Sequence, residues 1–474
     1  MRKHLPFWLL IISLLLVLII SKLIQDGMFL DGIFYSVVSK NMANGIGTFW
    51  SPFYSQSGFG GLTGFHEHPP LNFGIQSIFF RFLGNGMYTE RIYILVTLIA
   101  TLLLIVAIWK RVNIVNSEKN ISWLPLFFWI STPLVFWSFT NNMQENTMGI
   151  LILLSVYFYL KSLDPNSNEF VSLLLSGTFI FLASFSKGIP GLFPLSMPIL
   201  HWISARSISL GKVMYQFAVI FLTITLIYII LFLIPVCNES LSVYLFNRAI
   251  YRIGNNPTVD NNFWILYRLF IDIAPALGIF LLLLFIFKRN AAFKMNDRKN
   301  SLALFFIFLG IAGVAPMVFT KVQRGFYIVP TIPLFAIGFS LFISGPFSRW
   351  CNNFLDGKRH IYFNVLAVVT LCASLIFSLS FIGKTKRDEE MLEDIYKMGP
   401  HLRANSIIGV PHEMWNEYSF EGYFLRYFDV SMIEGNKYPY YVSPKNSTQP
   451  IPNGFTKIEL PTIKYDLYKG QNLK

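Results

Sequence analysis

Stretches of about 20 apolar residues recur along almost the whole chain, and this pattern limits the possible folds more than any other feature. Hydrophobic residues make up 54% of the 474 positions, and charged residues only 13%. A soluble protein of this length could not bury so much apolar surface. Helices that cross a hydrocarbon core of roughly 30 Å need such stretches. The sequence therefore predicts an α-helical polytopic membrane protein.

We expect about eleven transmembrane helices, within a range of about ten to thirteen. Arg2 and Lys3 precede the first segment, but its apolar core is too long for a signal peptide and no small-x-small cleavage site follows it. We therefore expect an uncleaved anchor whose N-terminus is cytoplasmic. The apolar segments are 5–24, 90–109, 121–139, 146–161, 170–186, 188–204, 213–236, 270–287, 301–319, 326–344 and 361–382.

The net charge of +13 belongs entirely to the part of the chain that contains these segments. Residues 384–474 carry 12 Lys/Arg and 12 Asp/Glu and are neutral. With the N-terminus inside, the inner loops hold 16 Lys/Arg and the longer outer loops hold 10. This distribution obeys the positive-inside bias. A nucleic-acid binder would cluster its basic residues with aromatic ones on a soluble domain, so we expect no nucleic-acid partner.

Two regions outside the membrane segments have a pattern of their own. The outer loop 25–89 contains helix-like stretches at 33–42 and 72–82, and its length favours a functional role. Residues 384–474 predict a small α/β domain, which an odd number of membrane segments places on the outer side. Its expected elements are helices at 387–397 and 414–428 and strands at 406–410, 430–433, 439–443 and 456–460.

The acidic residues indicate where chemistry could occur. Ion-coupled transporters usually carry ionisable groups at mid-membrane, whereas the acids of this chain lie at the predicted outer ends of the segments. A lipid or glycan transporter stays as the alternative function, and it should show a polar pathway or an internal repeat. The acids concerned are Asp26, Asp31, Glu67, Glu90, Glu145, Glu239, Asp260 and Asp272.

Asp31 follows the first segment by about seven residues. A carboxylate there could act as a general base on an incoming hydroxyl group. Asp is also a favoured N-cap residue, so Asp31 could instead cap a helix that begins at residue 32.

The run His66-Glu67-His68-Pro69-Pro70 places an acid between two imidazoles on a backbone that two prolines stiffen. It could direct these side chains to one site, or it could be a rigid turn with solvated side chains. Two histidines spaced by two residues with one Glu are weak grounds for a metal site, so we assign no metal ligands and no cofactor, and a requirement for a divalent metal stays open.

Two basic clusters lie on the predicted outer side, against the positive-inside bias. Lys187 interrupts two apolar segments in Ser186-Lys187-Gly188, and Lys321 and Arg324 precede Tyr327. Ammonium and guanidinium groups bind phosphate well, so a phosphate at the membrane surface is the expected counter-ion. Lys and Arg side chains that extend to the membrane surface from helix ends are the structural alternative.

Taken in order, these motifs resemble those of the polytopic glycosyltransferases with the GT-C fold, above all the aminoarabinose transferase of lipid A and the protein O-mannosyltransferases. The resemblance covers about 25–345. The motifs are Asp31 with Tyr35, Asn41 and Gly45; Glu67-His68-Pro69-Pro70; Ser186-Lys187-Gly188; and Lys321, Tyr327, Pro330 and Pro333.

The resemblance implies an enzyme that moves a sugar from a polyprenyl-phosphate donor to a lipid, glycan or protein acceptor on the periplasmic face of the inner membrane, with inversion. Residues 1–383 would form the transferase domain and 25–89 its catalytic loop. Asp31 would be catalytic with support from Glu67, and the substrate-binding residues would be Tyr35, His66, His68, Lys187, Lys321, Arg324 and Tyr327. Lys is common in the family where this chain has His68.

Overall fold

The computed structural model describes residues 2–58, 64–113, 115–288, 297–355 and 358–471. Its contacts divide the chain into two compact units. The helical unit comprises 1–22, 67–69 and 94–380, and the mixed unit comprises 23–66, 70–93 and 381–474. The mixed unit thus joins most of the predicted catalytic loop to the C-terminal segment. The boundary that we predict at residue 383 stays a prediction.

Long apolar helices dominate the helical unit. Eight helices in the described part of the chain are long and apolar enough to cross a membrane, so the chain is an integral multi-pass membrane protein. They are Leu5–Leu23, Thr89–Val112, Glu169–Lys187, Leu210–Leu233, Trp264–Phe287, Asp297–Phe319, Gly325–Phe354 and Arg359–Leu379.

The other three predicted segments are also helical, but each departs from a long apolar helix. The segment 121–139 is divided before Pro133, because proline cannot donate the backbone hydrogen bond that a continuous helix needs. The helix that contains 146–161 starts earlier, at Gln144, and its first turn is polar. The segment 188–204 starts as a 3₁₀-helix rich in proline. The predicted number of transmembrane helices stays a prediction.

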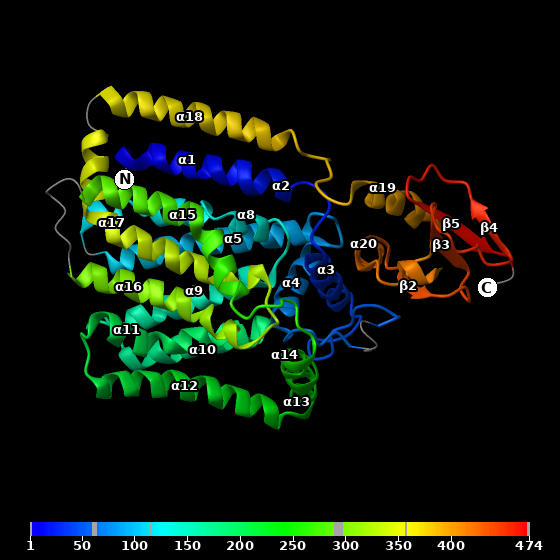
Figure 1. Cartoon of the computed structure of the whole chain (residues 1–474), viewed down its shortest axis with the longest axis horizontal. Coiled ribbons are helices and arrows are strands. Elements are labelled where there is room, and N and C mark those ends of the chain that lie inside the picture. The colour runs from blue at the N-terminus through cyan, green and yellow to red at the C-terminus, as the bar shows by residue number, and fades with distance from the viewer. Residues whose placement is uncertain (1, 59–63, 114, 289–296, 356–357, 472–474) are drawn as a thin grey trace. The chain divides into compact units, whose positions relative to one another are not determined.

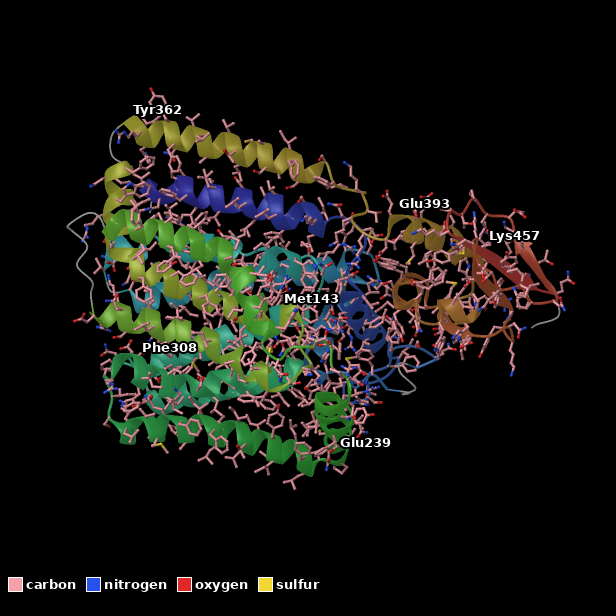
Figure 2. All side chains as sticks on the ribbon, viewed as in Figure 1. Met143, Glu239, Phe308, Tyr362, Glu393 and Lys457 are labelled. Atoms are coloured by element: carbon pink, nitrogen blue, oxygen red, sulfur yellow. The ribbon has the colours of Figure 1, made fainter. Side chains whose placement is uncertain are left out.

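The helices of this unit pack side by side, as Figure 1 shows for α1 with α18 and for α9, α10 and α12. Side chains fill the space between them, and Phe308 of α16 is labelled in Figure 2. The elements are η1 (Arg2–His4), α1 (Leu5–Leu15), η2 (Leu16–Ile20), α2 (Ser21–Leu23), α5 (Thr89–Val112), α6 (Asn116–Lys119), α7 (Trp123–Ile130), α8 (Pro133–Ser138), α9 (Gln144–Ser162), α10 (Glu169–Lys187), η3 (Ile189–Ser196), α11 (Met197–Ala205), α12 (Leu210–Leu233), α13 (Pro235–Ser242), η4 (Val243–Ile250), α14 (Tyr251–Asn255), α15 (Trp264–Lys288), α16 (Asp297–Ala312), η5 (Ala315–Phe319), η6 (Gly325–Thr331), α17 (Ile332–Phe354) and α18 (Lys358–Leu379).

The mixed unit contains a five-stranded sheet in the order β2-β1-β3-β5-β4. β1 is parallel to β2 and β3, whereas β5 is antiparallel to β3 and β4. Glu393 on α19 and Lys457 on β4 are labelled in Figure 2. The elements are α3 (Leu30–Ala43), α4 (Leu71–Leu83), α19 (Glu389–Met398), η7 (Gly399–His401), β1 (Ile407–Val410), η8 (His412–Met414), α20 (Tyr418–Phe428), β2 (Ser431–Glu434), β3 (Tyr440–Pro444), β4 (Phe455–Ile458) and β5 (Tyr465–Gly470).

This unit confirms the predicted helices and strands of the loop and of the C-terminal segment, and it adds β5. The core lies between the helices and one face of the sheet. Phe420 and Phe424 of α20 are fully buried, and the Phe420 ring packs against Tyr465 of β5 with 4.6 Å between centroids. Burial of such aromatic side chains supplies most of the stability of a small α/β unit.

Candidate functional site

A buried ion pair lies at the end of two neighbouring helices of the helical unit. Lys187 is the last residue of α10, and Glu145 lies in the first turn of α9, the end that Met143 marks in Figure 2. The Lys187 Nζ atom is 3.2 Å from Glu145 Oε1, and both side chains are almost fully buried. The two charges suit their helix ends, because a cation favours a C-terminus and an anion an N-terminus.

The chain turns sharply after this lysine. Gly188 has φ = +96°, a backbone conformation that favours glycine. A Cβ atom at Gly188 would collide with the hydroxyl group of Tyr244. Burial raises the pKa of that hydroxyl group, and the nearby Tyr228 and Tyr327 add to the rise. The glycine thus lets a tyrosine of η4 approach the backbone beside Lys187.

Two arginines hold Glu67. The Arg248 Nε atom is 2.9 Å from Glu67 Oε1, and Arg252 forms an ion pair with Glu67 Oε2. The arginines are four residues apart, so the helical segment of η4 and α14 presents both to one carboxylate. Glu239 marks the preceding helix α13 in Figure 2.

His68 joins the two ion-paired groups. Its Nε2 atom is 3.4 Å from Lys187 Nζ. Burial and the charges of Lys187 and Arg252 hold the pKa of His68 well below its usual range. The imidazole is therefore neutral at physiological pH, and it can contact an anion as a hydrogen-bond donor but not as a cation.

These five ionisable side chains form what we name the cation centre: Glu67, Glu145, Lys187, Arg248 and Arg252. Three basic side chains face two acidic ones, so the centre has a formal excess of one positive charge. The ring of Phe326 lies 5.8 Å from Lys187 Nζ and covers it with an aromatic face.

Lys321 and Arg324 precede η6, and Tyr327 lies within it. Of these three predicted residues, only Tyr327 has a described interaction near the cation centre. Tyr327 contributes to the raised pKa of Tyr244, as described above. Lys321 and Arg324 are exposed, and neither forms an ion pair with any residue that the structure describes. Their role stays a prediction.

The remaining predicted residues lie in the mixed unit. Asp31 occupies the first turn of α3, while Phe29 is the N-cap residue, so the alternative in which Asp31 caps the helix is wrong. The carboxylate instead gains from the positive end of the helix dipole. Tyr35 is buried and its ring packs near that of Phe73, with 6.0 Å between centroids. The ring of His66 lies against Gly64.

The sequence motifs assigned no specific role to Arg248, Arg252 or Tyr244, and they identified Glu145 only as one of several acids at the predicted outer ends. The spacing of four between the arginines was the available signal, because it places both on one face of a helix. Their partner Glu67 lies almost 200 residues away in the chain, and only the fold reveals the pairing. Within the described ranges, no group of three or more His, Cys, Asp or Glu side chains is arranged to hold a metal ion.

Known structures resemble this chain over nearly its whole length. No protein-family profile matches the sequence, and no curated protein is similar to it. ArnT from Cupriavidus metallidurans bound to undecaprenyl phosphate superimposes with a TM-score of 0.63 at 13% identity, over 97% of each chain. The chain has the GT-C fold.

Two further structures agree with this fold. The oligosaccharyltransferase of Archaeoglobus fulgidus in the apo form gives a TM-score of 0.53 at 11% identity, over 92% of this chain and 70% of that one. The arabinofuranosyltransferase AftD from Mycobacteria gives 0.50 at 11% identity, over 98% and 40%.

Proposed function

We propose that the protein is a membrane glycosyltransferase that moves a sugar from a polyprenyl-phosphate donor to an acceptor on the outer face of the membrane. The observation that carries the proposal is the cation centre, which gathers Lys187, Arg248 and Arg252 around Glu67 and Glu145. Ammonium and guanidinium groups in a partly buried site are suited to a phosphate group.

The charge balance fits this donor. A sugar joined to a polyprenyl phosphate carries one phosphodiester and hence one negative charge, which matches the excess positive charge of the cation centre. Departure of the lipid phosphate increases its negative charge, and the cations stabilise that change in the transition state. A neutral His68 adds a hydrogen bond without a further charge.

An apolar groove supports the lipid part of the donor. A cavity of about 460 Å³ lies between η3 and α12. Its wall includes Tyr228, whose hydroxyl group is 2.7 Å from Ser184 Oγ, near the end of α10 that carries Lys187. A prenyl chain would enter this groove from the lipid, so its binding would depend on van der Waals packing against the groove wall and not on removal of apolar surface from water. The lining residues are Leu192, Leu195, Phe221, Ile224, Thr225, Tyr228, Ile229, Phe232 and Leu233.

In this mechanism Asp31 accepts the proton of the acceptor hydroxyl group, which attacks the anomeric carbon as the lipid phosphate leaves. One in-line displacement inverts the anomeric centre. Glu67 orients Arg248 and Arg252, and Lys321, Arg324, Tyr35 and His66 complete the substrate contacts. The N-terminus would be cytoplasmic, and residues 384–474 would lie on the outer side with the acceptor.

The test is a comparison of lipid-linked sugars and envelope glycans by mass spectrometry. Cells that produce the wild type are compared with cells that produce Asp31→Asn or Lys187→Met at equal levels in the membrane. We expect each variant to accumulate one polyprenyl-phosphate sugar and to lose the same sugar from one acceptor. Unchanged profiles in both variants would contradict the transferase and would favour the transporter.

A further inference from the structure

A fully buried lysine in the mixed unit has no part in the mechanism above. Lys40 lies in the last turn of α3, and its side chain is 1% exposed. Its Nζ atom donates hydrogen bonds to the carbonyl oxygens of Leu425 and Arg426 at 2.5 and 3.0 Å, and to Asp429 Oδ1 at 2.6 Å. These acceptors form the C-terminal end of α20, so Lys40 binds α3 to that helix end.

The contact is chemically specific. Carbonyl groups in the last turn of a helix lack partners within the helix, and the helix dipole attracts a cation there. Asp429, the C-cap residue of α20, has φ = +57°, and this turn brings its carboxylate to the same ammonium group. All three donor positions of the Lys40 ammonium group are thus satisfied.

A second contact lies at the other end of α3. The Tyr423 hydroxyl group accepts a hydrogen bond from the Met28 backbone N–H at 2.9 Å and is 3.1 Å from the Met28 carbonyl oxygen. One residue earlier, a Cβ atom at Gly422 would come within 2.9 Å of Ile33, so the two helices touch closely there. α20 therefore contacts α3 and the residues just before it on both sides of Asp31, at residues 28, 33 and 40.

Burial of this ion pair costs free energy, so we ask what else the contact provides. Burying a lysine carries a desolvation penalty, and a buried ion pair is often no more stabilising than apolar residues of the same size. In some proteins such pairs fix one arrangement of the parts that they join. Here the part that is fixed is the helix that carries Asp31.

We infer that Lys40 and Tyr423 are positioning residues, through which the C-terminal segment holds α3 and thereby the carboxylate of Asp31 in its reactive orientation. This inference rests on the proposed function, because it assumes that Asp31 acts on the acceptor. It assigns the C-terminal segment a part in catalysis, in addition to any contact with the acceptor.

The test compares Lys40→Met, Lys40→Arg and Tyr423→Phe with Asp31→Asn. Val442→Ala serves as the control: Val442 is fully buried in β3, so the substitution should destabilise the same unit, and Val442 is not one of the residues described above as joining α20 to α3. Three quantities are measured: the polyprenyl-phosphate sugar that accumulates in cells, binding of undecaprenyl phosphate to the purified protein, and amide hydrogen exchange in peptides covering 29–39.

We expect Lys40→Met to accumulate the donor as Asp31→Asn does, because a displacement of about 1 Å in a reacting group can lower the rate about 100-fold. Binding of undecaprenyl phosphate should change less than twofold, within about 0.4 kcal/mol, and exchange in 29–39 should rise about tenfold, since the docking contact is lost. Lys40→Arg should recover part of the activity, because it keeps the cation. Val442→Ala should lower the melting temperature without donor accumulation.

The outcomes separate the two proposals. If Asp31→Asn accumulates the donor while Lys40→Met and Tyr423→Phe behave as the wild type, the positioning role is wrong and the proposed function stands. If Asp31→Asn leaves the profiles unchanged, the positioning role is wrong together with the catalytic role of Asp31, and Lys187→Met then decides whether the transferase stands. If Lys40→Met does not fold, Tyr423→Phe decides, because it keeps the aromatic packing and removes only the hydroxyl group.

Discussion

The two units each contain a cluster of three cations with acidic partners, and the clusters differ in balance and exposure. In the helical unit, the cation centre has two acids for three cations, and Arg248 and Arg252 are 19% and 37% exposed. In the mixed unit, which includes the first residues of α5 (89–93), Lys40, Arg91 and Arg426 face three acids and are 1%, 4% and 2% exposed. The acids of this second cluster are Asp26, Glu90 and Asp429.

The second cluster also contains many hydrogen bonds. Asp26 Oδ1 accepts from Gly27 N–H, from Arg91 and from Tyr427 at 2.7, 3.0 and 2.8 Å. Arg426 donates to the carbonyl oxygens of Asn85 and Gly86 and to Glu90 at 2.6 to 2.9 Å. A formally neutral, buried cluster with many hydrogen bonds is typical of a structural role, whereas an excess of cations and partly exposed arginines are what the proposed phosphate site requires.

The sharpest test of this comparison replaces an arginine in each cluster. Arg426→Met should lower the free energy of unfolding by about 3–5 kcal/mol, because it removes one of the two arginines that pair with the buried Glu90 and leaves two carbonyl oxygens without their donor. Arg252→Met removes a half-exposed partner and should cost about 1 kcal/mol or less. Both variants are unfolded by urea in the same detergent, and equal losses would break the comparison.

The second prediction concerns activity. Lys187→Met should lower transfer about 10²- to 10³-fold, the usual effect of losing one group that stabilises developing charge. It also leaves Glu145 without this cation, so Lys187→Met/Glu145→Gln is the matched control. The double variant should regain stability but not activity, as measured by unfolding and by donor accumulation. Recovery of activity in the double variant would show that Lys187 has only a structural role.

The third prediction concerns pH and the mixed unit. Burial raises the pKa of Glu421 to about 7, although Ser57 donates a hydrogen bond to its carboxyl group at 3.2 Å. The folded state then binds the proton more tightly than the unfolded state, whose pKa is about 4.5. Stability from this group is therefore complete below about pH 4.5, falls as the pH rises towards 7 and is constant above that.

Glu421→Gln keeps the shape of the side chain and removes the titration. Between pH 4 and 8, the unfolding free energy of the wild type should fall by about 3 kcal/mol relative to this variant. Unfolding of both proteins across this range measures the difference. A constant difference would mean that Glu421 does not titrate with the raised pKa.

The last prediction concerns the turn beside the cation centre. Gly188→Ala forces a side chain into a left-handed conformation and against Tyr244, at a cost of about 1–3 kcal/mol. Gly188→Ala/Tyr244→Phe removes the collision with the hydroxyl group and should recover part of that cost. Thermal unfolding of the two variants measures the recovery, and none is expected if the backbone conformation alone is responsible.

The sequence predicts the parts of this fold that depend on local patterns. Apolar runs indicate the membrane helices, and periodicity indicates α3, α4 and all but one strand of the C-terminal sheet. The sequence did not predict β5, because its alternation of apolar and polar residues is short and is interrupted by Asp466 and Lys469. Asp31, Glu67, His68 and Lys187 could be named from motifs. Motifs could not identify the contacts between residues far apart in the chain. These are the ion pairs made by Glu145, Arg248 and Arg252, and the contacts of α20 with α3.

The pairing of Glu67 with two arginines has a consequence for selectivity. A carboxylate that is fixed to the same chain competes with any dissolved anion at an effective concentration in the millimolar range. Inorganic phosphate or sulfate must displace it by charge alone. An anion that is joined to a long apolar chain has a second source of binding energy and can displace the carboxylate at far lower concentration. In the proposed function, the Glu67 carboxylate would thus make the cation centre selective for lipid-bound phosphate over the free ion.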